Sequence, residues 1–523
     1  MDSSHSHPTQ RMASYFASLL VDTFTVLLAF LGTKDLLKLD SALTDRDLRD
    51  KYLDALSKIP IEHLLERELL SKTNWEWLFH WLCLRGAAAL SGVASKTLIL
   101  PFEADDYTLT LLSKRSATRA NVEEVVYDYY GEDANAVDHL FTQSPDCDCM
   151  ITATGMAVFA HLPRLRVLRL KRIPEMLTCS SLVHISELPI EVLDLNGCGS
   201  GGGITRLGMN YIAALSCLKY LDILDSFGPY PGALEVLANC KTLESLKVSL
   251  NYVTDNELKR FSDPASPLAK TLTALHITNI DEITNDGIAH LARGFKKLLS
   301  LITICKGTRP GVTGACLKHI AEHLTCLQRL EVGFTSMSDA DLEFLGRMKS
   351  LVYVMVLSYA FTGSGDAFTG SGLAFLKSIQ SLREVTVFSN GFTAEGLESL
   401  QHLHMLTKFD IRPFSGALTG EMMAKIRHLA SLKHLIWMDN PWMDNPNHHE
   451  GITDESLAAL SELNHLESLE LFSCRKITGE GLFGLAKACP TLKHISIGPF
   501  KKKRDLAKTL ARLGVSVSFY GGR

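Results

Sequence analysis

A short leucine pattern that recurs along most of the chain constrains its fold more than any other feature. The pattern is L-x-x-L-x-L, or its Ile, Val or aromatic equivalent, and it begins thirteen times between Leu165 and Leu492. The intermediate starts are Ile190, Leu218, Leu243, Leu272, Leu299, Leu327, Leu351, Leu382, Leu406, Leu432 and Leu466. The twelve intervals span 327 residues, about 27 residues each. A period of this length predicts stacked repeats, each packing only on its neighbours.

Each repeat is expected to contain one strand and one helix. Alternation within the leucine pattern predicts a short strand with one buried face. Between strands, an apolar residue followed by Thr or Ser opens a helical pattern, where the hydroxyl can cap the helix for about 1 kcal/mol. These pairs are Ile151-Thr152, Ile204-Thr205, Val253-Thr254, Ile283-Thr284, Val312-Thr313, Met337-Ser338, Phe368-Thr369, Phe392-Thr393, Leu418-Thr419, Ile452-Thr453 and Ile477-Thr478. The predicted fold class is α/β: a curved, horseshoe-like solenoid with an inner parallel sheet and outer helices.

Length variation is concentrated where a strand passes into a helix. From the capping Thr or Ser to the next strand Leu, nine of the eleven distances are 13 or 14 residues, whereas the strand-to-cap distance runs from 11 to 21. Two tandem duplications lie on the variable side. Ala360–Asp366 is repeated as Ala367–Leu373, and Trp437–Pro441 is repeated as Trp442–Pro446. We interpret them as slippage tolerated in surface loops, with selected binding loops as the alternative.

Composition and cysteine positions indicate a globular intracellular protein. The chain has 523 residues, of which 46% are hydrophobic and 21% charged, and its net charge of -5 argues against a nucleic-acid or anionic-membrane partner. Four of the twelve cysteines recur at fixed repeat positions, namely Cys198, Cys240, Cys474 and Cys489. At such positions a thiol acts as a small buried hydrophobe, which favours a reduced compartment. Cys147-x-Cys149 is the only close pair and completes no zinc set, so we expect neither a metal nor a cofactor.

An apolar segment near the N-terminus predicts a helical module. Residues 16–32 are mostly apolar but are interrupted by Asp22 and fall short of the ~20 residues that span a bilayer, so no membrane segment is expected. One predicted helix places its apolar residues on a single face, and a second begins after Gly32. The residues of the face are Leu20, Phe24, Leu27, Leu28 and Leu31, and the second helix carries Leu36, Leu37, Leu39 and Leu43.

This module resembles the F-box over roughly 40 residues. Leu31 and Lys34-Asp35-Leu36 carry the resemblance, whereas Leu20-Val21 stands where the family has Leu-Pro and the tryptophan of the third helix is missing. The resemblance implies that a Skp-type adaptor docks on the module. The residues it would contact are Leu20, Phe24, Leu27, Leu28, Leu31 and Leu36. The alternative is a plain helical cap for the solenoid.

The repeats are similar to the cysteine-containing class of leucine-rich repeats found in F-box–leucine-rich-repeat proteins. Leu466–Leu482 carries the likeness most fully, through the string C-x-x-I-T-x-x-G-L that starts at Cys474. The resemblance implies a substrate receptor of a Skp-cullin-F-box ubiquitin ligase. The alternative is a leucine-rich-repeat scaffold or inhibitor without ligase coupling.

We therefore divide the chain into a disordered tail (1–12), an F-box-like module (13–60), a helical cap with irregular first repeats (61–150) and the solenoid (151–523). Thr97–Leu100 and Val122–Tyr127 are predicted as two early strands, which bring the stack to fifteen.

A protein-binding site is predicted on the inner face of the sheet. On this face we count six basic and six acidic side chains, a balance that does not suit a phosphate backbone. Apolar and aromatic side chains lie among them, which favours a protein partner over incidental exposure. The predicted contact residues are Tyr353, Met355, Leu357, Phe388, Arg412, Ile436, Met438 and Phe472.

No catalytic site is expected. Asn196–Thr205 is glycine-rich but lacks the lysine of a phosphate-binding loop, and His448-His449-Glu450 forms no recognised metal set. Lys501–Arg504 is a solvated turn or a nuclear signal. The expected protein is a cytoplasmic or nuclear binding protein rather than an enzyme.

Overall fold

The computed structural model describes about three fifths of the chain. The described residues are 97–100, 106, 109, 122–128, 151, 153–173, 181–198, 204–225, 230–304, 311–334, 337–358, 370–389, 392–413, 420–437, 452–471, 476–498 and 503–519. The chain forms two compact units, Met1–Leu243 and Glu244–Arg523, and each is described by itself. The boundaries at 12, 60 and 150 remain predictions.

In the described part of the first unit, five parallel strands follow one another in sequence order. Its elements are β1 (Thr97–Ile99), β2 (Glu124–Asp128), α9 (Ala153–Phe159), β3 (Val167–Lys171), η3 (Ser181–Ile185), β4 (Val192–Asp194), α10 (Arg206–Ala214), β5 (Tyr220–Ile223) and η4 (Leu234–Asn239), where η marks a 3₁₀ helix. Each strand pairs in parallel with the next. Strands β1 and β2 confirm the two early strands expected from the sequence.

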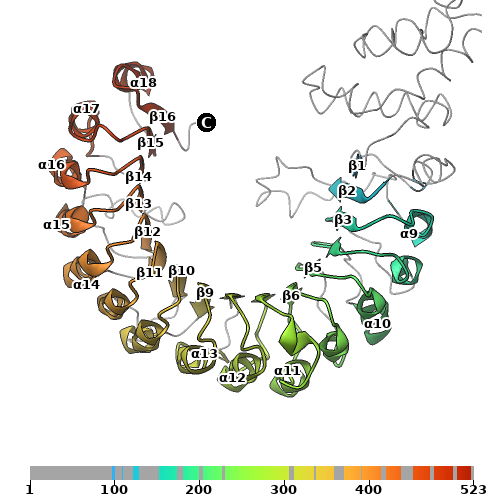
Figure 1. Cartoon of the computed structure of the whole chain (residues 1–523). Helices are drawn as coiled ribbons and strands as arrows, with labels where there is room; N and C mark the ends of the chain where they lie inside the picture. The colour runs from blue at the N-terminus through green and yellow to red at the C-terminus, as the bar shows by residue number, and fades with distance from the viewer. Residues whose placement is uncertain are drawn as a thin grey trace, which may run out of the picture. The chain divides into compact units, whose positions relative to one another are not determined.

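The second unit repeats the same arrangement from β6 to β16. Its strands are β6 (Ser245–Ser249), β7 (Ala274–Thr278), β8 (Ser300–Ile304), β9 (Arg329–Phe334), β10 (Tyr353–Ser358), β11 (Glu384–Ser389), β12 (Lys408–Pro413), β13 (His434–Trp437), β14 (Ser468–Leu471), β15 (His494–Ile497) and β16 (Ser516–Phe519). All neighbours pair in parallel. Helices cover the outer face of this sheet, which leaves a concave inner face (Figure 1).

The covering helices of the second unit are a mixture of α and 3₁₀ segments. The α-helices are α11 (Asp255–Phe261), α12 (Asn285–Gly294), α13 (Cys316–His323), α14 (Ala394–Glu398), α15 (Gly420–Lys425), α16 (Asp454–Ala459), α17 (Gly479–Ala488) and α18 (Lys503–Ala511). The 3₁₀ segments are η5 (Leu268–Lys270), η6 (Asp339–Arg347), η7 (Ser371–Ser378), η8 (Ser399–His402), η9 (Ile426–His428) and η10 (Leu460–Glu462). The leucine spacing therefore located the covering elements but did not distinguish a 3₁₀ helix from an α-helix.

All thirteen predicted strands are present, but the register predicted for β8 is wrong by one residue. Leu298 is fully buried and occupies the first core position, whereas Leu299, the predicted start, is 40% exposed. The shift places Thr303 in the core, where its hydroxyl has no hydrogen-bond partner. It also turns Ile302 and Ile304 onto the concave face. Because Thr303 stands where the pattern expects an apolar residue, the leucine pattern of β8 was assigned one residue too late. The terminal strand β16 was not predicted.

The cysteines behave as small core residues. All six that lie in the described part of the chain are free thiols. Cys198, Cys240 and Cys489 are buried, as their repeat positions predicted, and the Cys198 thiol donates to the Leu170 carbonyl. Cys474 lies outside the described residues. Burial raises the pKa of Cys240 to about 11 and that of Cys316 still further.

These environments predict a clear order of reactivity with an alkylating reagent at pH 8. Cys326 is exposed and Cys217 half-buried, so both should be modified in the native protein. Cys240, Cys316 and Cys489 should stay unmodified until the protein unfolds, because the reactive thiolate is disfavoured by burial. Timed alkylation followed by peptide mass spectrometry measures this order. Equal rates at Cys316 and Cys326 would contradict the burial described above.

The capping residues do more than the sequence predicted. As expected, the hydroxyl of Thr478 accepts hydrogen bonds from the Glu480 and Gly481 amides at the start of α17. The same hydroxyl donates to Asp454, the first residue of α16 in the preceding repeat, at 2.6 Å. The Thr478 amide donates to the other oxygen of that carboxylate at 2.8 Å. One carboxylate therefore fixes the helix start of the following repeat.

This cross-repeat clasp, an acidic or amide side chain of one repeat bonded to the capping residue of the next, recurs in the second unit. Asp255 accepts from the amide and hydroxyl of Thr284 at 2.9 and 2.6 Å. Asn285 makes a related pair with Thr313, which stands two residues before Ala315, the N-cap of α13: the Thr313 amide donates to Asn285 Oδ1, and Asn285 Nδ2 donates to the Thr313 hydroxyl, at 2.9 Å each. In the two aspartate clasps the acceptor belongs to the earlier repeat.

Glycine at the third helical position makes room for the clasp. A Cβ atom at Gly481 would fall inside contact distance of the Asp454 carboxylate, and one at Gly287 would meet Asp255 in the same way. Neither glycine has a positive φ angle, so close approach and not backbone conformation requires it. The G of the C-x-x-I-T-x-x-G-L string therefore has a packing role.

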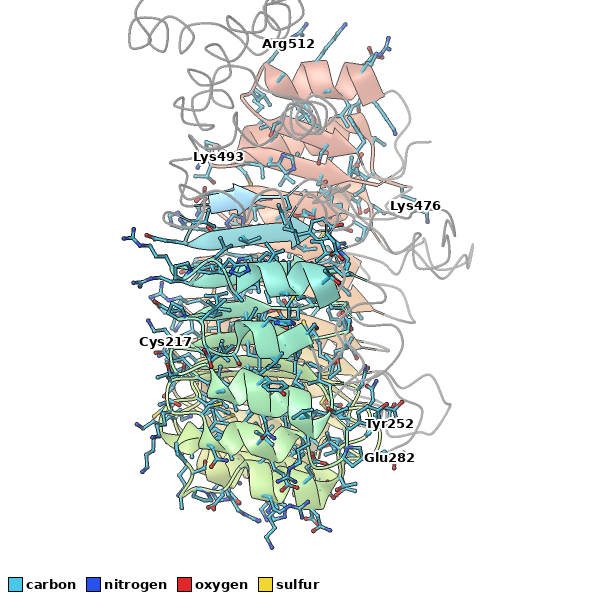
Figure 2. All side chains as sticks on the ribbon, turned by 90° about the vertical axis from the view of Figure 1, so that its right-hand side faces the viewer. Cys217, Tyr252, Glu282, Lys476, Lys493 and Arg512 are labelled. Carbon is cyan, nitrogen blue, oxygen red and sulfur yellow. The ribbon has the colours of Figure 1, made fainter. Side chains whose placement is uncertain are left out.

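Because the strands are parallel, the connections between helices and strands form two opposite edges of the second unit. We call the side on which the chain enters each strand the helix-to-strand edge. Its ten connections, counted together with the end of the preceding helix and, in the first, with η5, are 262–273, 293–299, 322–328, 347–352, 377–383, 402–407, 427–433, 462–467, 487–493 and 511–515. The side on which the chain leaves each strand is the strand-to-helix edge. Figure 2 shows Lys493 on the first edge and Tyr252, Glu282 and Lys476 on the second.

Candidate protein-binding face

The register of the strands places the predicted contact residues side by side on the concave face. On β10, Val354 and Val356 are fully buried, so Tyr353 and Met355 point to the opposite, concave side. Tyr353 is aligned with Arg329 on β9, and Phe388 on β11 with Arg412 on β12. We define the concave patch as Ile302, Ile304, Arg329, Tyr353, Met355, Phe388, Arg412 and Ile436. It extends over β8 to β13.

Arg412 is held in place from two sides. Its Nε and Nη2 donate to the two oxygens of Asp410, each at 2.8 Å. Its guanidinium carbon lies 5.0 Å from the centre of the Phe388 ring. Burial opposes the charged form, but the hydrogen bonds and charge of Asp410 outweigh it and raise the pKa of Arg412. The guanidinium is therefore a fixed, permanently charged part of the patch.

Arg329 repeats this arrangement at the other side of the patch. It donates to Glu331 on the same strand, and its guanidinium carbon lies 4.0 Å from the centre of the Tyr353 ring. Burial and the charge of Glu331 raise the pKa of Tyr353 above its ordinary value, so the phenol stays protonated at neutral pH. Each arginine thus covers an aromatic ring of a neighbouring strand and is anchored by a buried carboxylate.

The acidic and basic side chains that the sequence predicts in equal number on the inner face differ in their exposure to solvent. The side chains of Glu331 and Asp410 are 11% and 6% exposed, whereas those of Arg329 and Arg412 are 48% and 35% exposed. In the first unit, Arg169 and Lys171 lie 3.5 and 3.3 Å from the buried carboxylate of Asp194. These charges are largely satisfied within the protein, so the face offers arginine and apolar groups more than free carboxylates.

The structure places five of the predicted contact residues on the concave face, and their contact with a partner stays a prediction. Tyr353, Met355, Phe388, Arg412 and Ile436 are half-buried and share the concave face. One was expected to be exposed and is not: Leu357 is only 7% exposed beside Phe388, so it offers little contact area. Met438 and Phe472 lie outside the described residues. So do the predicted adaptor contacts Leu20, Phe24, Leu27, Leu28, Leu31 and Leu36.

Ile302 and Ile304 also belong to this patch, although the predicted register of β8 had placed both in the core. Both are half-buried, and Ile302 is aligned with Glu331 on β9. The signal was present in the spacing. Starting β8 at Leu298 makes the Thr284-to-Leu distance 14 residues, within the usual 13 or 14, whereas Leu299 makes it 15.

The described residues hold no group of three or more side chains suited to a metal ion. Within that same part of the chain, no helix is long and apolar enough to cross a membrane.

Comparisons with known proteins identify the repeat. A model of the leucine-rich repeat matches residues 462–486, which contain β14 and most of α17. The same strand-and-helix unit recurs through the described residues, so the chain is built of leucine-rich repeats. No curated protein sequence matches it closely enough to count as a relative.

Several solved structures are similar at low identity. An internalin of Listeria monocytogenes is 15% identical, with a TM-score of 0.35, over 70% of this chain and 83% of the internalin. A chain of the yeast Rad7 and Elc1 complex is 15% identical, with a TM-score of 0.42, over 93% of this chain and 98% of the matched chain. A leucine-rich-repeat protein of Leptospira interrogans is 15% identical, with a TM-score of 0.40, over 78% of this chain and 91% of the Leptospira protein.

Proposed function

We propose that this stack of leucine-rich repeats binds a protein partner through the concave patch. The observation that carries the proposal is the pairing of two arginines, the exposed Arg329 and the half-buried Arg412, with aromatic rings on neighbouring strands, among half-buried apolar side chains. Tyrosine, arginine and apolar anchors of this kind dominate binding energy at protein interfaces. Because Asp410 and Glu331 already hold the arginines in place, a partner gains their contacts with little loss of side-chain entropy. The chemistry we propose is binding and not catalysis.

We further propose that binding serves a ubiquitin ligase, with the chain as substrate receptor. The F-box-like sequence around Leu31 and Lys34-Asp35-Leu36 supports this role, because it implies a dock for a Skp-type adaptor. The competing proposal is a scaffold or inhibitor that binds through the same patch without a ligase.

Affinity purification of the full chain, analysed by mass spectrometry, separates the two proposals. A substrate receptor should recover a Skp-type adaptor and a cullin, and Leu20→Asp with Leu31→Asp should abolish both while the patch partner is retained. The matched control is Thr25→Asp with Ala29→Asp, which adds the same charge outside the predicted apolar face. Recovery of a patch partner alone supports the scaffold. A partner set unchanged by substitutions in the patch would refute binding through the concave patch.

A further inference from the structure

The helix-to-strand edge of the second unit is strongly basic in a chain that is acidic as a whole. Its ten connections contain thirteen Lys and Arg residues against four Asp and Glu residues, while the chain carries a net charge of -5. On the opposite, strand-to-helix edge, Asp255, Asp339 and Asp454 are the first residues of α11, η6 and α16, where a carboxylate complements the helix N-terminus. The net charge of the whole chain therefore does not reveal the excess of cations on the helix-to-strand edge.

Helix capping explains only some of these cations. Cations are favoured at helix C-termini, which lie on this edge. Lys297 donates to the Lys270 carbonyl at 2.9 Å, and Lys349 donates to the Gly346 carbonyl at 2.6 Å, so both satisfy helix ends. Arg383, Lys433 and Lys493 instead stand immediately before β11, β13 and β15, beyond the last helical turn. The helix dipole gives no reason for a cation there.

The acidic residues on this edge do not neutralise it. Glu467 lies between Lys433 at 3.1 Å and Lys493 at 2.7 Å, so two lysines share one carboxylate. Hydrogen bonds from these lysines lower the pKa of Glu467 to about 2, which shows that the local field favours a negative charge. Lys296 and Arg383 are exposed and make no ion pair with any described residue.

Exposed apolar side chains are interspersed with the cations. In the described part of the second unit, five large apolar side chains are exposed, and three of them lie on this edge. They are Leu299, Met405 and Leu513, at 40%, 47% and 40% exposure. A phosphate backbone has no groups that would bury them, whereas a polypeptide with both acidic and apolar side chains does.

We propose that the helix-to-strand edge binds an acidic polypeptide segment whose apolar side chains contact Leu299 and Met405. The carboxylates of the segment pair with the unpaired cations, chiefly Lys296 and Arg383, and displace part of the Glu467 interaction. This surface is separate from the concave patch, so the chain can hold two polypeptides at once.

Fluorescence anisotropy with synthetic peptides tests the proposal on the full chain. The probe is a labelled peptide of repeated Glu-Glu-Leu, compared with repeated Glu-Glu-Ser and with a single-stranded oligonucleotide of equal charge. We expect the leucine peptide to bind most tightly and to weaken as salt is raised. Lys296→Glu, Arg383→Glu and Lys433→Glu together should weaken it by about tenfold or more. Lys259→Glu, Lys318→Glu and Lys476→Glu, which make the same charge change elsewhere, should leave it within about twofold.

A second pair of variants tests the apolar part. Leu299→Ser with Met405→Ser should weaken the leucine peptide by about threefold or more and leave the serine peptide unchanged. If the charge-reversed protein shows a lowered melting temperature, the corresponding glutamine variants replace it. The proposal would be overturned if the edge triple variant and the control triple variant bound the leucine peptide equally. It would also be overturned if the oligonucleotide bound as tightly as the leucine peptide. Substitutions in the concave patch should not affect binding of the leucine peptide. Failure of the edge proposal is therefore distinguishable from failure of the proposed function of the concave patch.

Discussion

Gly481→Ala is expected to destabilise the C-terminal repeats by about 2 kcal/mol. The added methyl group would overlap the Asp454 carboxylate, which must then move away from Thr478. The movement breaks two hydrogen bonds to a charged acceptor, at 2.8 and 2.6 Å. Chemical denaturation measures the loss, and hydrogen exchange should show it in α16 and α17 rather than along the whole stack.

The same helix supplies a matched control. Gly484 also lies in α17, but a Cβ atom there would meet nothing within 4 Å. Gly484→Ala should therefore stabilise the protein by about 0.5–1 kcal/mol, the usual gain from replacing an exposed helical glycine. If Gly481→Ala were equally stabilising, the clasp would not restrict space at that position.

A double-mutant cycle isolates the clash. In an Asp454→Ala background the obstructing carboxylate is gone, so Gly481→Ala should cost little or become favourable. Additive effects of the two substitutions would show that the glycine acts independently of Asp454.

Tyr353→Ala with Phe388→Ala is expected to reduce the affinity for the patch partner by about 100-fold or more. The double change removes both rings and also leaves Arg329 and Arg412 without the surfaces that orient them. The partner is the one recovered by affinity purification. Calorimetric titration of this partner against the wild-type chain and against the double variant gives the two dissociation constants, whose ratio is the loss of affinity.

Two exposed aromatics outside the patch provide the control. Tyr252 and Phe375 are 49% and 38% exposed and lie away from the concave strands. Tyr252→Ala with Phe375→Ala removes the same two side-chain types and should change the affinity by less than about threefold. Equal losses in the two double variants would place the partner elsewhere on the molecule.

The sequence was sufficient to predict the repeat because its strongest signal, a buried leucine, is also the strongest determinant of the core. Leu165, Leu330 and Leu469 are all fully buried, and the intervening spacing located every one of the thirteen strands. Weaker determinants were missed. Strand β16 follows the short α18 and ends in Val517 and Phe519, without the leucines of the pattern.

Prediction of the site was limited by register and by side-chain pairing. Alternation correctly placed Tyr353 and Phe388 on the concave face, but Thr303 in a core position shifted β8 and hid Ile302 and Ile304. Counting charges could not show that Asp410 and Glu331 are buried beneath arginines. Accessibility depends on the neighbouring strand, which is 24 or more residues away in the sequence. The F-box resemblance concerns residues outside the described part of the chain and remains a prediction.

The clasp between repeats gives the stack a direction. In the clasps of Asp255 and Asp454, the accepting carboxylate lies in the earlier repeat and the capping threonine in the later one, so the later repeat depends on its predecessor for its helix start but not on its follower. Removing repeats from the C-terminal end leaves only a carboxylate such as Asp454, which water solvates readily. Removing them from the N-terminal side leaves a helix start without its acceptor and a vacant space beside its glycine. Shortened forms of this protein should therefore tolerate loss of their last repeats better than loss of their first.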